Sequence, residues 1–504
     1  MSKKTCITTP IYYVNDKPHI GHAYTNIACD AIARFNKLNG NDVFFLTGTD
    51  EHGQKVQSSA EKNGVEPKEF VDSVCETFKE LNNKLNISND DFIRTSEERH
   101  FNSSQKLWET VKKNGYIYKG EYSGWYSQRD EAYYQEDELV DGKAPTGAEV
   151  KWIVEESYFF KLSSFQERLL KYIDENPNFI APKSRLNEVK AFIESGLKDI
   201  CISRSSFSWG IPVPGEKGHI MYVWFDALSN YITALGHGTE KFDEETFKNT
   251  THIIGKDILR FHAVYWPAFL MAANLPLPKR IFAHGWWTVE GEKMSKSTGN
   301  AISPIDLINE YYLDGIRYFL LMEIPFGQDG DFSKSSLKQR LNSDLANSYG
   351  NLVQRVCSFV YKNCDKSVPK FNNMSNKDNE IFDLSLKTLD EVIFFMDNEE
   401  INKAIKSIWN LISKANQYMD FQAPWKLKKT DEERMKTILY VLLNIIRRIG
   451  ILTFPFMPNT SERILLQIGE DIKKINNEGF SIYKNMIPVG QEIIEPEVFF
   501  KKFD

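Results

Sequence analysis

The sequence predicts an α/β fold in which a parallel sheet is split by an insertion and followed by an all-α bundle. Three observations lead to this prediction. The chain opens with a β-α-β pattern, residues 119–210 are rich in Tyr, Trp and turn residues, and helix-like apolar stripes run from about residue 335 nearly to the end. Because a helical crossover joins parallel strands, the first pattern indicates a parallel sheet.

The β-α-β pattern begins with residues 5–14, which are typical of a strand with Pro10 near its exit. Apolar residues then recur at helical spacing over 20–38, and Gly40 ends the predicted helix. The apolar run 43–47 predicts a second strand. Further short strands are expected downstream of the insertion, at 251–255 and 280–285.

The C-terminal part carries apolar residues at helical spacing in consecutive segments, which predicts a bundle of packed helices. These segments are 337–363, 376–397, 400–421, 431–453 and 459–468.

Composition restricts the class of protein. The 504 residues suggest about two to four domains, and 41% hydrophobic and 26% charged residues are ordinary for a soluble globular protein. No run of 18 apolar residues predicts a membrane span. A formal net charge of −7 argues against a wholly basic surface, although lysines cluster locally at Lys426, Lys428 and Lys429.

The six cysteines show no C-x-x-C spacing, so we expect free thiols in a reducing cytosol and no metal site.

The first motif lies at the crossover from strand to helix and reads Pro18-His19-Ile20-Gly21-His22. A helix N-terminus offers unpaired N–H groups and a positive dipole end, so it suits a phosphate. Gly21 lets a ligand approach the backbone, and two imidazoles could donate to phosphate oxygens as charge shifts. The alternative is an ordinary helix start with two surface histidines.

The second motif is Gly291-Glu292-Lys293-Met294-Ser295-Lys296-Ser297-Thr298-Gly299-Asn300. Glycines at its ends favour a loop, and its two lysines place point charges within reach of one polyphosphate. Such a loop could close over ATP. The alternative is a solvated surface loop.

The two motifs, in this order around a split α/β domain, resemble the class I aminoacyl-tRNA synthetases. Further motifs resemble the methionyl-tRNA synthetases along essentially the whole chain. They are Thr9-Pro10-Ile11-Tyr12-Tyr13-Val14-Asn15, Thr47-Gly48-Thr49-Asp50-Glu51-His52-Gly53, Val223-Trp224-Phe225-Asp226-Ala227-Leu228, Ile254-Gly255-Lys256-Asp257 and Ala283-His284-Gly285-Trp286-Trp287.

The resemblance implies an ATP-dependent methionine–tRNA ligase that forms methionyl-adenylate and serves translation initiation and elongation. It implies His19, His22, Lys293 and Lys296 as catalytic residues, while Glu51 and His52 stay unassigned. The expected ATP-binding residues are His19, Gly21, His22, Asp257, Gly285, Lys293 and Lys296. The expected methionine-binding residues are Ile11, Tyr13, Asp50, Trp224, Ala227, Tyr231 and His284.

The expected anticodon-binding residues are Asn351, Arg355 and Trp425, again by resemblance. Asn351 and Arg355 are four apart and share a helix face if this segment is helical. Asn and Arg can bond base edges, and Trp can stack on an unpaired base. The alternatives are an exposed helix pair and a core tryptophan.

The resemblance implies a Rossmann-type catalytic domain with an inserted connective-peptide domain. Five ranges follow: catalytic first half 1–118, connective peptide 119–210, catalytic second half 211–290, lysine loop and stem-contact region 291–345, and helical anticodon-binding domain 346–504.

Two departures from the family pattern bear on cofactors and partners. Where many relatives carry cysteine knuckles, this chain has Trp125-Tyr126-Ser127-Gln128-Arg129-Asp130, so no zinc is expected. Many relatives append a C-terminal tRNA-binding or dimerisation domain, whereas this sequence stops at Asp504 directly after the predicted bundle, so we expect a monomer. The other expectations are methionine, ATP with Mg²⁺, and tRNA(Met) as substrates, a cytoplasmic location and no membrane.

The sequence disfavours three other functions. Another class I synthetase, for leucine, isoleucine, valine or cysteine, is disfavoured because the insertion is short for an editing domain. A small nucleotidyltransferase would not need the helical bundle. A non-catalytic tRNA-binding protein would have no reason to keep His19, His22, Lys293 and Lys296 together.

Overall fold

The computed structural model describes the chain apart from residues 1, 15–16, 130–131, 135, 290 and 294–301. Its described residues form two compact units. One unit comprises residues 4–18 and 44–284, and the other comprises 1–3, 19–43 and 285–504. The chain thus passes from one unit to the other at residue 19, which is where the first motif lies.

A seven-stranded sheet organises the unit formed by 4–18 and 44–284. Its order is β2-β3-β1-β12-β13-β8, with β4 paired to β3. Register places β12 parallel to both β1 and β13, and β3 parallel to both β2 and β4, which confirms the predicted parallel sheet. Their bounds are β1 Lys4–Thr8, β2 Tyr12–Tyr13, β3 Asp42–Asp50, β4 Asp91–Arg94, β8 Ile180–Ala181, β12 Thr250–Gly255 and β13 Arg280–His284.

The predicted strand over 5–14 is in fact two strands. Pro10 lies between them, and proline has no N–H to donate to a sheet. The chain steps across after Thr9, so β1 pairs with β12 whereas β2 pairs with β3. This step carries Ile11 and Tyr13 past the end of β1.

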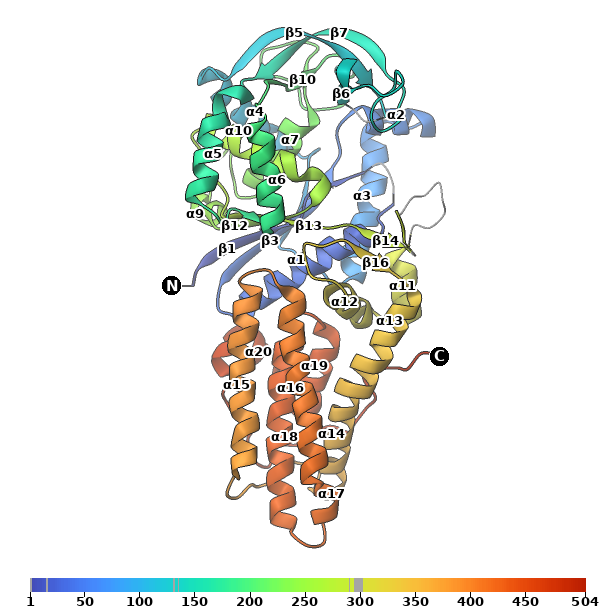
Figure 1. Cartoon of the computed structure of the whole chain (residues 1–504), viewed down its shortest axis with the longest axis vertical. Coiled ribbons are helices and arrows are strands. Elements are labelled where there is room, and N and C mark those ends of the chain that lie inside the picture. The colour runs from blue at the N-terminus through green and yellow to red at the C-terminus, as the bar shows by residue number, and fades with distance from the viewer. Residues whose placement is uncertain (1, 15–16, 130–131, 135, 290, 294–301) are drawn as a thin grey trace. The chain divides into compact units, whose positions relative to one another are not determined.

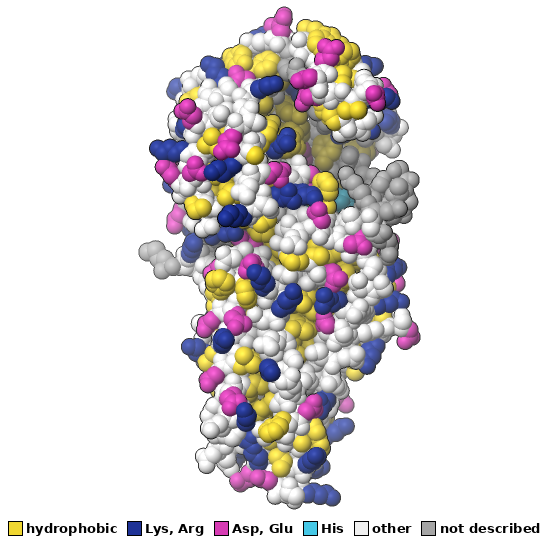
Figure 2. Space-filling view, in the orientation of Figure 1, with side chains coloured by type: hydrophobic (Ala, Val, Ile, Leu, Met, Phe, Trp, Pro, Cys, Tyr) yellow, Lys and Arg dark blue, Asp and Glu magenta, His cyan; other side chains and the backbone are white. Residues whose placement is uncertain are grey.

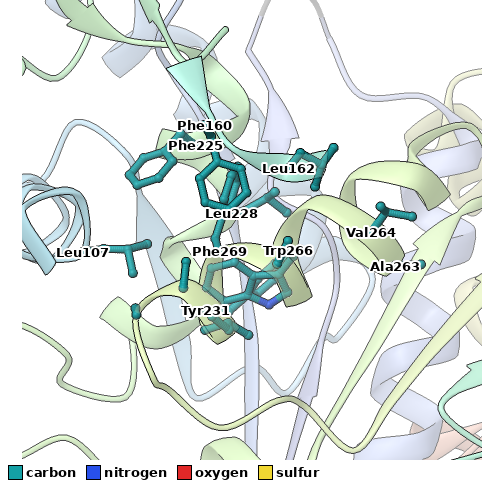
Figure 3. Close-up of a cluster of buried hydrophobic side chains, with 14 of the residues drawn as sticks. Leu107, Phe160, Leu162, Phe225, Leu228, Tyr231, Ala263, Val264, Trp266 and Phe269 are labelled. Atoms are coloured by element: carbon teal, nitrogen blue, oxygen red, sulfur yellow. The ribbon is translucent and has the colours of Figure 1, made fainter. Parts of the chain in front are cut away.

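Helices flank this sheet along the chain. They are α2 Gln54–Asn63, α3 Pro67–Lys84, α4 Glu98–Lys113, α5 Gln166–Glu175, α6 Lys183–Glu194, α7 Val223–Leu228, α8 Asn230–Thr233, α9 Glu244–Lys248 and α10 Trp266–Ala272. A buried apolar cluster joins α4, α7, α8 and α10, and Figure 3 shows Tyr231, Trp266 and Phe269 together within it. Burial of this much aromatic and aliphatic surface is the main force that holds these short helices in place.

The insertion has an antiparallel sheet of its own, with order β6-β5-β7-β9. Strands β5 (Ile117–Ser127) and β7 (Lys151–Phe160) form the long curved ribbon labelled in Figure 1. The other strands are β6 Ala132–Tyr134 and β9 Ile200–Cys201, and a separate small sheet pairs β10 Ser203–Arg204 with β11 Ile220–Met221. Between β7 and β9 the chain returns to the main sheet, where Ile180 of β8 pairs with Ile281. The range 119–210 therefore contains an edge strand of the main sheet.

The other unit contains α1 and the C-terminal helices. Helix α1 (Ile20–Leu38) agrees with its predicted range, as do the bundle helices that begin at Asn376, Ile401, Glu432 and Pro458. Two short helices of the bundle, Pro424–Leu427 and Ile472–Glu478, fall outside the predicted ranges. The bundle comprises α14 Asn351–Asn363, α15 Asn376–Met396, α16 Ile401–Gln422, α17 Pro424–Leu427, α18 Glu432–Thr453, α19 Pro458–Gln467 and α20 Ile472–Glu478, of which α15, α16 and α18 run side by side in Figure 1. The segments before it are β14 Trp287–Val289, β15 Glu292–Lys293, α11 Pro304–Tyr311, α12 Leu313–Met322, β16 Gly330–Phe332, α13 Lys334–Arg340 and the π-helix η5 Leu341–Gly350.

A buried ion pair fastens α1 to the helices of its own unit. Nη2 of Arg317 in α12 lies 2.6 Å from Oδ2 of Asp30 in α1, and both side chains are fully buried. Arg317 also donates to the carbonyl oxygens of Pro455 and Phe456, which precede α19. The guanidinium thus satisfies a carboxylate and two carbonyls at once, which compensates for the cost of burying its charge.

The surface carries charges of both signs. On the face in Figure 2, Lys and Arg side chains are interspersed with Asp and Glu side chains, in keeping with the modest net charge of −7. No helix among the described residues is long and apolar enough to cross a membrane.

Candidate active site

Helix α1 begins with a cap made by both histidines of the first motif. Nδ1 of His19 accepts from the N–H of Gly21 at 3.1 Å, and Nδ1 of His22 accepts from the N–H of His19 at 3.0 Å. The two rings lie 4.0 Å apart between centroids. A Cβ on Gly21 would come within 2.9 Å of the His19 ring, so glycine is the residue that fits beneath it. This reciprocal cap satisfies two N–H groups that a helix start otherwise leaves unpaired.

The cap also fixes the tautomer of the two rings. Because each Nδ1 accepts a hydrogen bond, each neutral ring carries its proton on Nε2. An Nε2–H group is a donor that can bond a phosphate oxygen. The helix start therefore presents two imidazole donors together with the positive end of the helix dipole.

Three of the residues predicted to bind methionine lie on two short helices, Trp224 and Ala227 on α7 and Tyr231 on α8. The two short helices follow each other directly and meet at Ser229. The indole of Trp224 stacks on Phe261 with centroids 3.5 Å apart and planes within 5°. Tyr231 is 2% exposed and Ala227 is 5% exposed, whereas Trp224 is partly exposed at the edge of the apolar cluster.

A histidine that the sequence did not single out joins this group. The hydroxyl of Tyr231 lies 2.8 Å from Nε2 of His262, and Nδ1 of His262 lies 3.1 Å from the carbonyl oxygen of Ile258. Burial lowers the pKa of His262 to about 4, so its ring is neutral at pH 7. Nδ1–H therefore donates to Ile258, and Nε2 accepts from Tyr231. A lone histidine in an apolar helix usually belongs to the core, so spacing alone could not have found it.

The first-strand residues separate into two groups. Ile11 packs against the same apolar cluster as Trp224 and Tyr231. Tyr13 instead packs against a smaller cluster of Tyr12, Val14, Val56, Val71 and Phe78. Tyr13 is also the register partner of Asp50 at the end of β3, so these two predicted methionine-binding residues are neighbours.

His284 and Asp257 lie at the ends of two adjacent strands. His284 ends β13 opposite Gly255, the last residue of β12, and is 6% exposed. The carboxylate of Asp257 folds back over Gly255, where a Cβ would lie 2.6 Å from its Oδ1. The structure thus brings His284 close to Asp257, a predicted ATP-binding residue. Ligands of parallel sheets bind at this carboxyl edge.

Gly285 has a packing role of its own. A Cβ at this position would lie 2.3 Å from the backbone of Gln328, and the N–H of Trp286 donates to Asp329.

The structure describes the second motif only in part. The backbone of Lys293 lies in β15 opposite Thr288, but its side chain and the whole of Lys296 lie outside the described residues.

Glu51, left unassigned by the sequence, is fully buried. Its carboxylate accepts from Arg94 through both oxygens and also from Thr49 and Ser96. Trp209 donates to its carbonyl oxygen. These contacts brace the turn that follows Asp50, which is the role of a structural carboxylate.

The predicted anticodon-binding residues gather on one surface of the bundle. Asn351 is exposed at the start of α14, and the guanidinium of Arg355 lies 5.4 Å from the ring centroid of Trp425. Trp425 is 42% exposed, so it is not a core tryptophan. Nη2 of Arg355 also lies 2.7 Å from Oδ1 of Asp420. The ring and the guanidinium together offer a stacking platform and hydrogen-bond donors, which suit an unpaired base.

Comparison with known proteins identifies the family. The model "tRNA synthetases class I (M)" matches residues 5–151 and 146–357, and "Anticodon binding domain of methionyl tRNA ligase" matches 368–504. The chain belongs to the class I methionyl-tRNA synthetases. This outcome confirms the predicted family, the predicted fold class and the prediction that the protein is a methionine–tRNA ligase.

Relatives and solved structures match along nearly the whole chain. The methionine–tRNA ligase of Rickettsia conorii is 51% identical over an alignment of 516 positions that covers 100% of both chains. That of Brucella suis is 53% identical over 92% of this chain and 91% of its own. The Mycobacterium tuberculosis methionyl-tRNA synthetase in complex with methionyl-adenylate superposes with a TM-score of 0.95, at 43% identity and 99% coverage of both chains. The apo form of that synthetase gives a TM-score of 0.89 at 40% identity, covering 100% of this chain and 99% of its own.

Proposed function

We propose that this enzyme joins methionine to tRNA(Met) in two steps and that the residues described above carry them out. In the first step, a carboxylate oxygen of methionine attacks the α-phosphorus of ATP, the bond to the β-phosphate oxygen breaks, and pyrophosphate leaves. In the second step, a hydroxyl of the terminal tRNA ribose attacks the acyl carbon, loses its proton, and AMP leaves. The charged tRNA then serves translation initiation and elongation.

The observation that carries this proposal is the reciprocal cap at His19 and His22. Neither step needs a covalent intermediate with the enzyme, so catalysis depends on positioning and on stabilising charge at phosphorus. The cap holds two Nε2–H donors at a helix N-terminus. Donors fixed in this way act on negative charge as it develops, without having to reorganise at the moment of reaction.

Methionine binding is assigned to Ile11, Tyr13, Asp50, Trp224, Ala227, Tyr231 and His284, to which we add His262. A thioether needs a mostly apolar, polarizable slot, and aromatic rings suit sulfur. Stacked Trp224 and Phe261 and the ring of Tyr231 supply such surfaces. The carboxylate of Asp50 is the acceptor for the α-ammonium group. His284 lies at the strand end with Asp257, so we place it at the carboxylate end of methionine rather than at its sulfur.

ATP binding is assigned to His19, Gly21, His22, Asp257, Gly285, Lys293 and Lys296. Asp257 can accept from a ribose hydroxyl, and the two lysines neutralise charge on the polyphosphate. ATP enters with Mg²⁺ bound chiefly to its phosphates. The described residues contain no group of three His, Cys, Asp or Glu side chains that could hold a metal.

Anticodon binding is assigned to Asn351, Arg355 and Trp425, which the bundle brings to one surface. We further propose that the enzyme acts as a monomer in the cytoplasm and holds no structural zinc. The support for the last point is the Trp125–Asp130 segment, which carries serine, glutamine and arginine where knuckle cysteines stand in many relatives.

The test is amino-acid-dependent ATP–pyrophosphate exchange run with all twenty amino acids, followed by charging of tRNA(Met). We expect exchange to depend on methionine and charging to require a tRNA with the CAU anticodon. Exchange stimulated best by another amino acid would overturn the proposed substrate. Exchange without charging would overturn the proposed second step.

A further inference from the structure

A carboxylate with no part in the chemistry above lies buried between two histidines. Oδ2 of Asp226 is 2.6 Å from Nδ1 of His52, and Oδ1 of Asp226 is 2.8 Å from Nε2 of His100. Asp226 and His100 are fully buried and His52 is 2% exposed. Each oxygen of the carboxylate thus has its own ring nitrogen as a partner.

The three side chains come from three separate parts of the chain. His52 follows Asp50 by two residues at the exit of β3, Asp226 stands between Trp224 and Ala227 in α7, and His100 belongs to α4. The His52–Asp226 contact therefore joins the segment proposed to hold the ammonium group of methionine to the helix proposed to hold its side chain. These segments are 174 residues apart along the chain.

Further hydrogen bonds extend the contact to the point where α7 and α8 meet. Ser104 in α4 lies 2.6 Å, oxygen to oxygen, from Ser229, and Ser229 donates to the carbonyl oxygen of Asp226. Nδ1 of His100 lies 3.3 Å from the hydroxyl of Thr233 in α8. Helix α4 therefore holds both α7 and α8 through polar contacts in a dry interior, where each contact is strong and directional.

The ionisation of Asp226 suits this arrangement. Burial raises the pKa of its carboxyl, but the electrostatic attraction of His52 and the hydrogen bonds from both histidines outweigh burial and hold the pKa below its usual range. An ionised carboxylate buried in this way would be costly without such donors. It accepts one N–H from each ring, so the protonated positions are Nδ1 of His52 and Nε2 of His100.

We propose that Asp226 is a positioning residue for methionine, held by His52 and His100, which sets the distance between Asp50 and the Trp224–Ala227 helix. The inference rests on the proposed methionine site and adds three residues that touch no substrate. Two halves of one ligand, its ammonium and its side chain, are bound by segments that this carboxylate connects. A shift between them lowers affinity for methionine and leaves ATP affinity unchanged.

The experiment exploits the shapes of Asn and Gln. The amide nitrogen of Asn stands close to where Nδ1 stands in His, and that of Gln close to where Nε2 stands. His52→Asn therefore keeps the donor to Asp226, whereas His52→Gln misplaces it. For His100 the pair is reversed, because its Nε2 makes the contact, so His100→Gln keeps the donor and His100→Asn misplaces it.

Methionine and ATP KM values are measured by ATP–pyrophosphate exchange, with adenylate burst titration to count active molecules and thermal melting to follow folding. We expect His52→Asn and His100→Gln to stay within about twofold of the parent KM for methionine. His52→Gln and His100→Asn should raise it about tenfold or more, since a tenfold change corresponds to ~1.4 kcal/mol. The ATP KM should change less than about twofold in all four.

Two controls separate the possible failures. Asp378→Asn removes a buried carboxylate from the bundle and should lower stability without changing the methionine KM. Asp50→Asn tests the proposed site itself. If Asp50→Asn leaves the methionine KM unchanged, the proposed site is wrong; if it raises KM while the matched Asn and Gln variants at positions 52 and 100 behave alike, this inference alone is wrong. Loss of stability or of active fraction with no change in KM would likewise make the cluster purely structural and overturn the inference.

Discussion

The hydroxyl of Tyr231 donates to Nε2 of His262 across 2.8 Å, and both side chains are buried. The direction of this bond is fixed by the other nitrogen of the ring, which donates to Ile258. Tyr231 is therefore the donor of this bond and His262 the acceptor. This polar pair lies within an apolar cluster, and such a pair costs little only while both partners are present.

Removing one partner of this pair should weaken methionine binding. Tyr231→Phe leaves the Nε2 acceptor of His262 buried and unsatisfied, a penalty of about 1–3 kcal/mol. We expect the KM for methionine in pyrophosphate exchange to rise by about tenfold and the KM for ATP to stay constant. Tyr349→Phe is the matched control, because Tyr349 is a buried tyrosine of the other unit whose hydroxyl lies 3.3 Å from Thr453. Equal effects of the two variants on KM would contradict the role of Tyr231.

A substitution at His19 can separate the helix cap from the phosphate donor. Asn is among the best N-cap residues, so His19→Asn keeps an acceptor for the N–H of Gly21 but lacks the Nε2–H group. The melting temperature should be unchanged, while adenylate formation in a single turnover should fall by about 10²–10³-fold, the cost of losing one donor to developing charge. An unchanged rate in this folded variant would remove His19 from catalysis.

Damage to the bundle surface should spare adenylate formation. Trp425→Ala removes a stacking platform worth roughly 1–3 kcal/mol per base, so charging of tRNA(Met) should fall by about ten- to a hundredfold. Methionine-dependent pyrophosphate exchange and the melting temperature should not change. Trp152→Ala serves as control, because Trp152 is also an exposed tryptophan and lies on the insertion. Parallel loss of charging and exchange would mean that Trp425 is not an anticodon contact.

The bundle contains a carboxylate whose contribution to stability should depend on pH. Hydrogen bonds from Arg434 and Tyr418 outweigh burial and lower the pKa of Asp378 from 3.8 to about 2. Because the folded pKa is the lower one, the stabilisation is complete above pH ~4 and is lost as the pH falls towards 2. Asp378→Asn should therefore reduce the free energy of unfolding by about 1–3 kcal/mol at pH 7, with little difference from the parent near pH 2. Urea unfolding at both pH values measures this, with Asp390→Asn, at an exposed position of the same helix, as the control.

The purified enzyme should contain no stoichiometric zinc. The insertion offers Ser127, Gln128 and Arg129 where a knuckle would need thiolates, and these side chains are poor ligands for zinc. Elemental analysis of protein purified without chelators measures the metal directly. A content near one zinc per chain would contradict the prediction.

Elements with a strong local pattern could be predicted from the sequence. Helices α1, α15, α16 and α18 have long apolar stripes with a period of 3.6 residues, so their predicted and observed ends differ by at most one or two residues. Strand β8 has two residues and is defined by its partner β13, so no local pattern could reveal it. Pro10 predicts an exit from a strand, but the step that creates β2 depends on pairing with β3.

In the candidate site, too, the local motif could be predicted from the sequence and the long-range contacts could not. His19, Gly21 and His22 form a local motif, and their cap involves only neighbours in sequence. His262 and the His52–Asp226–His100 cluster depend on partners 31, 174 and 126 residues away, and spacing along the chain carries no information about such contacts.

Strand β8 limits which residues of the insertion can be deleted without exposing a sheet edge. A deletion guided by composition would remove residues 119–210 as one module and would take β8 with it, leaving the backbone of β13 open along a new sheet edge. Open edges recruit strands from other chains, so such a truncation would tend to aggregate. A cut confined to the β5–β7 ribbon would leave the β8–β13 pairing in place. The removable part of the insertion is thus the outer ribbon alone, because the base of the ribbon buries Ile117, Tyr158 and Phe160 in the apolar cluster and the helices and strand that follow belong to the scaffold.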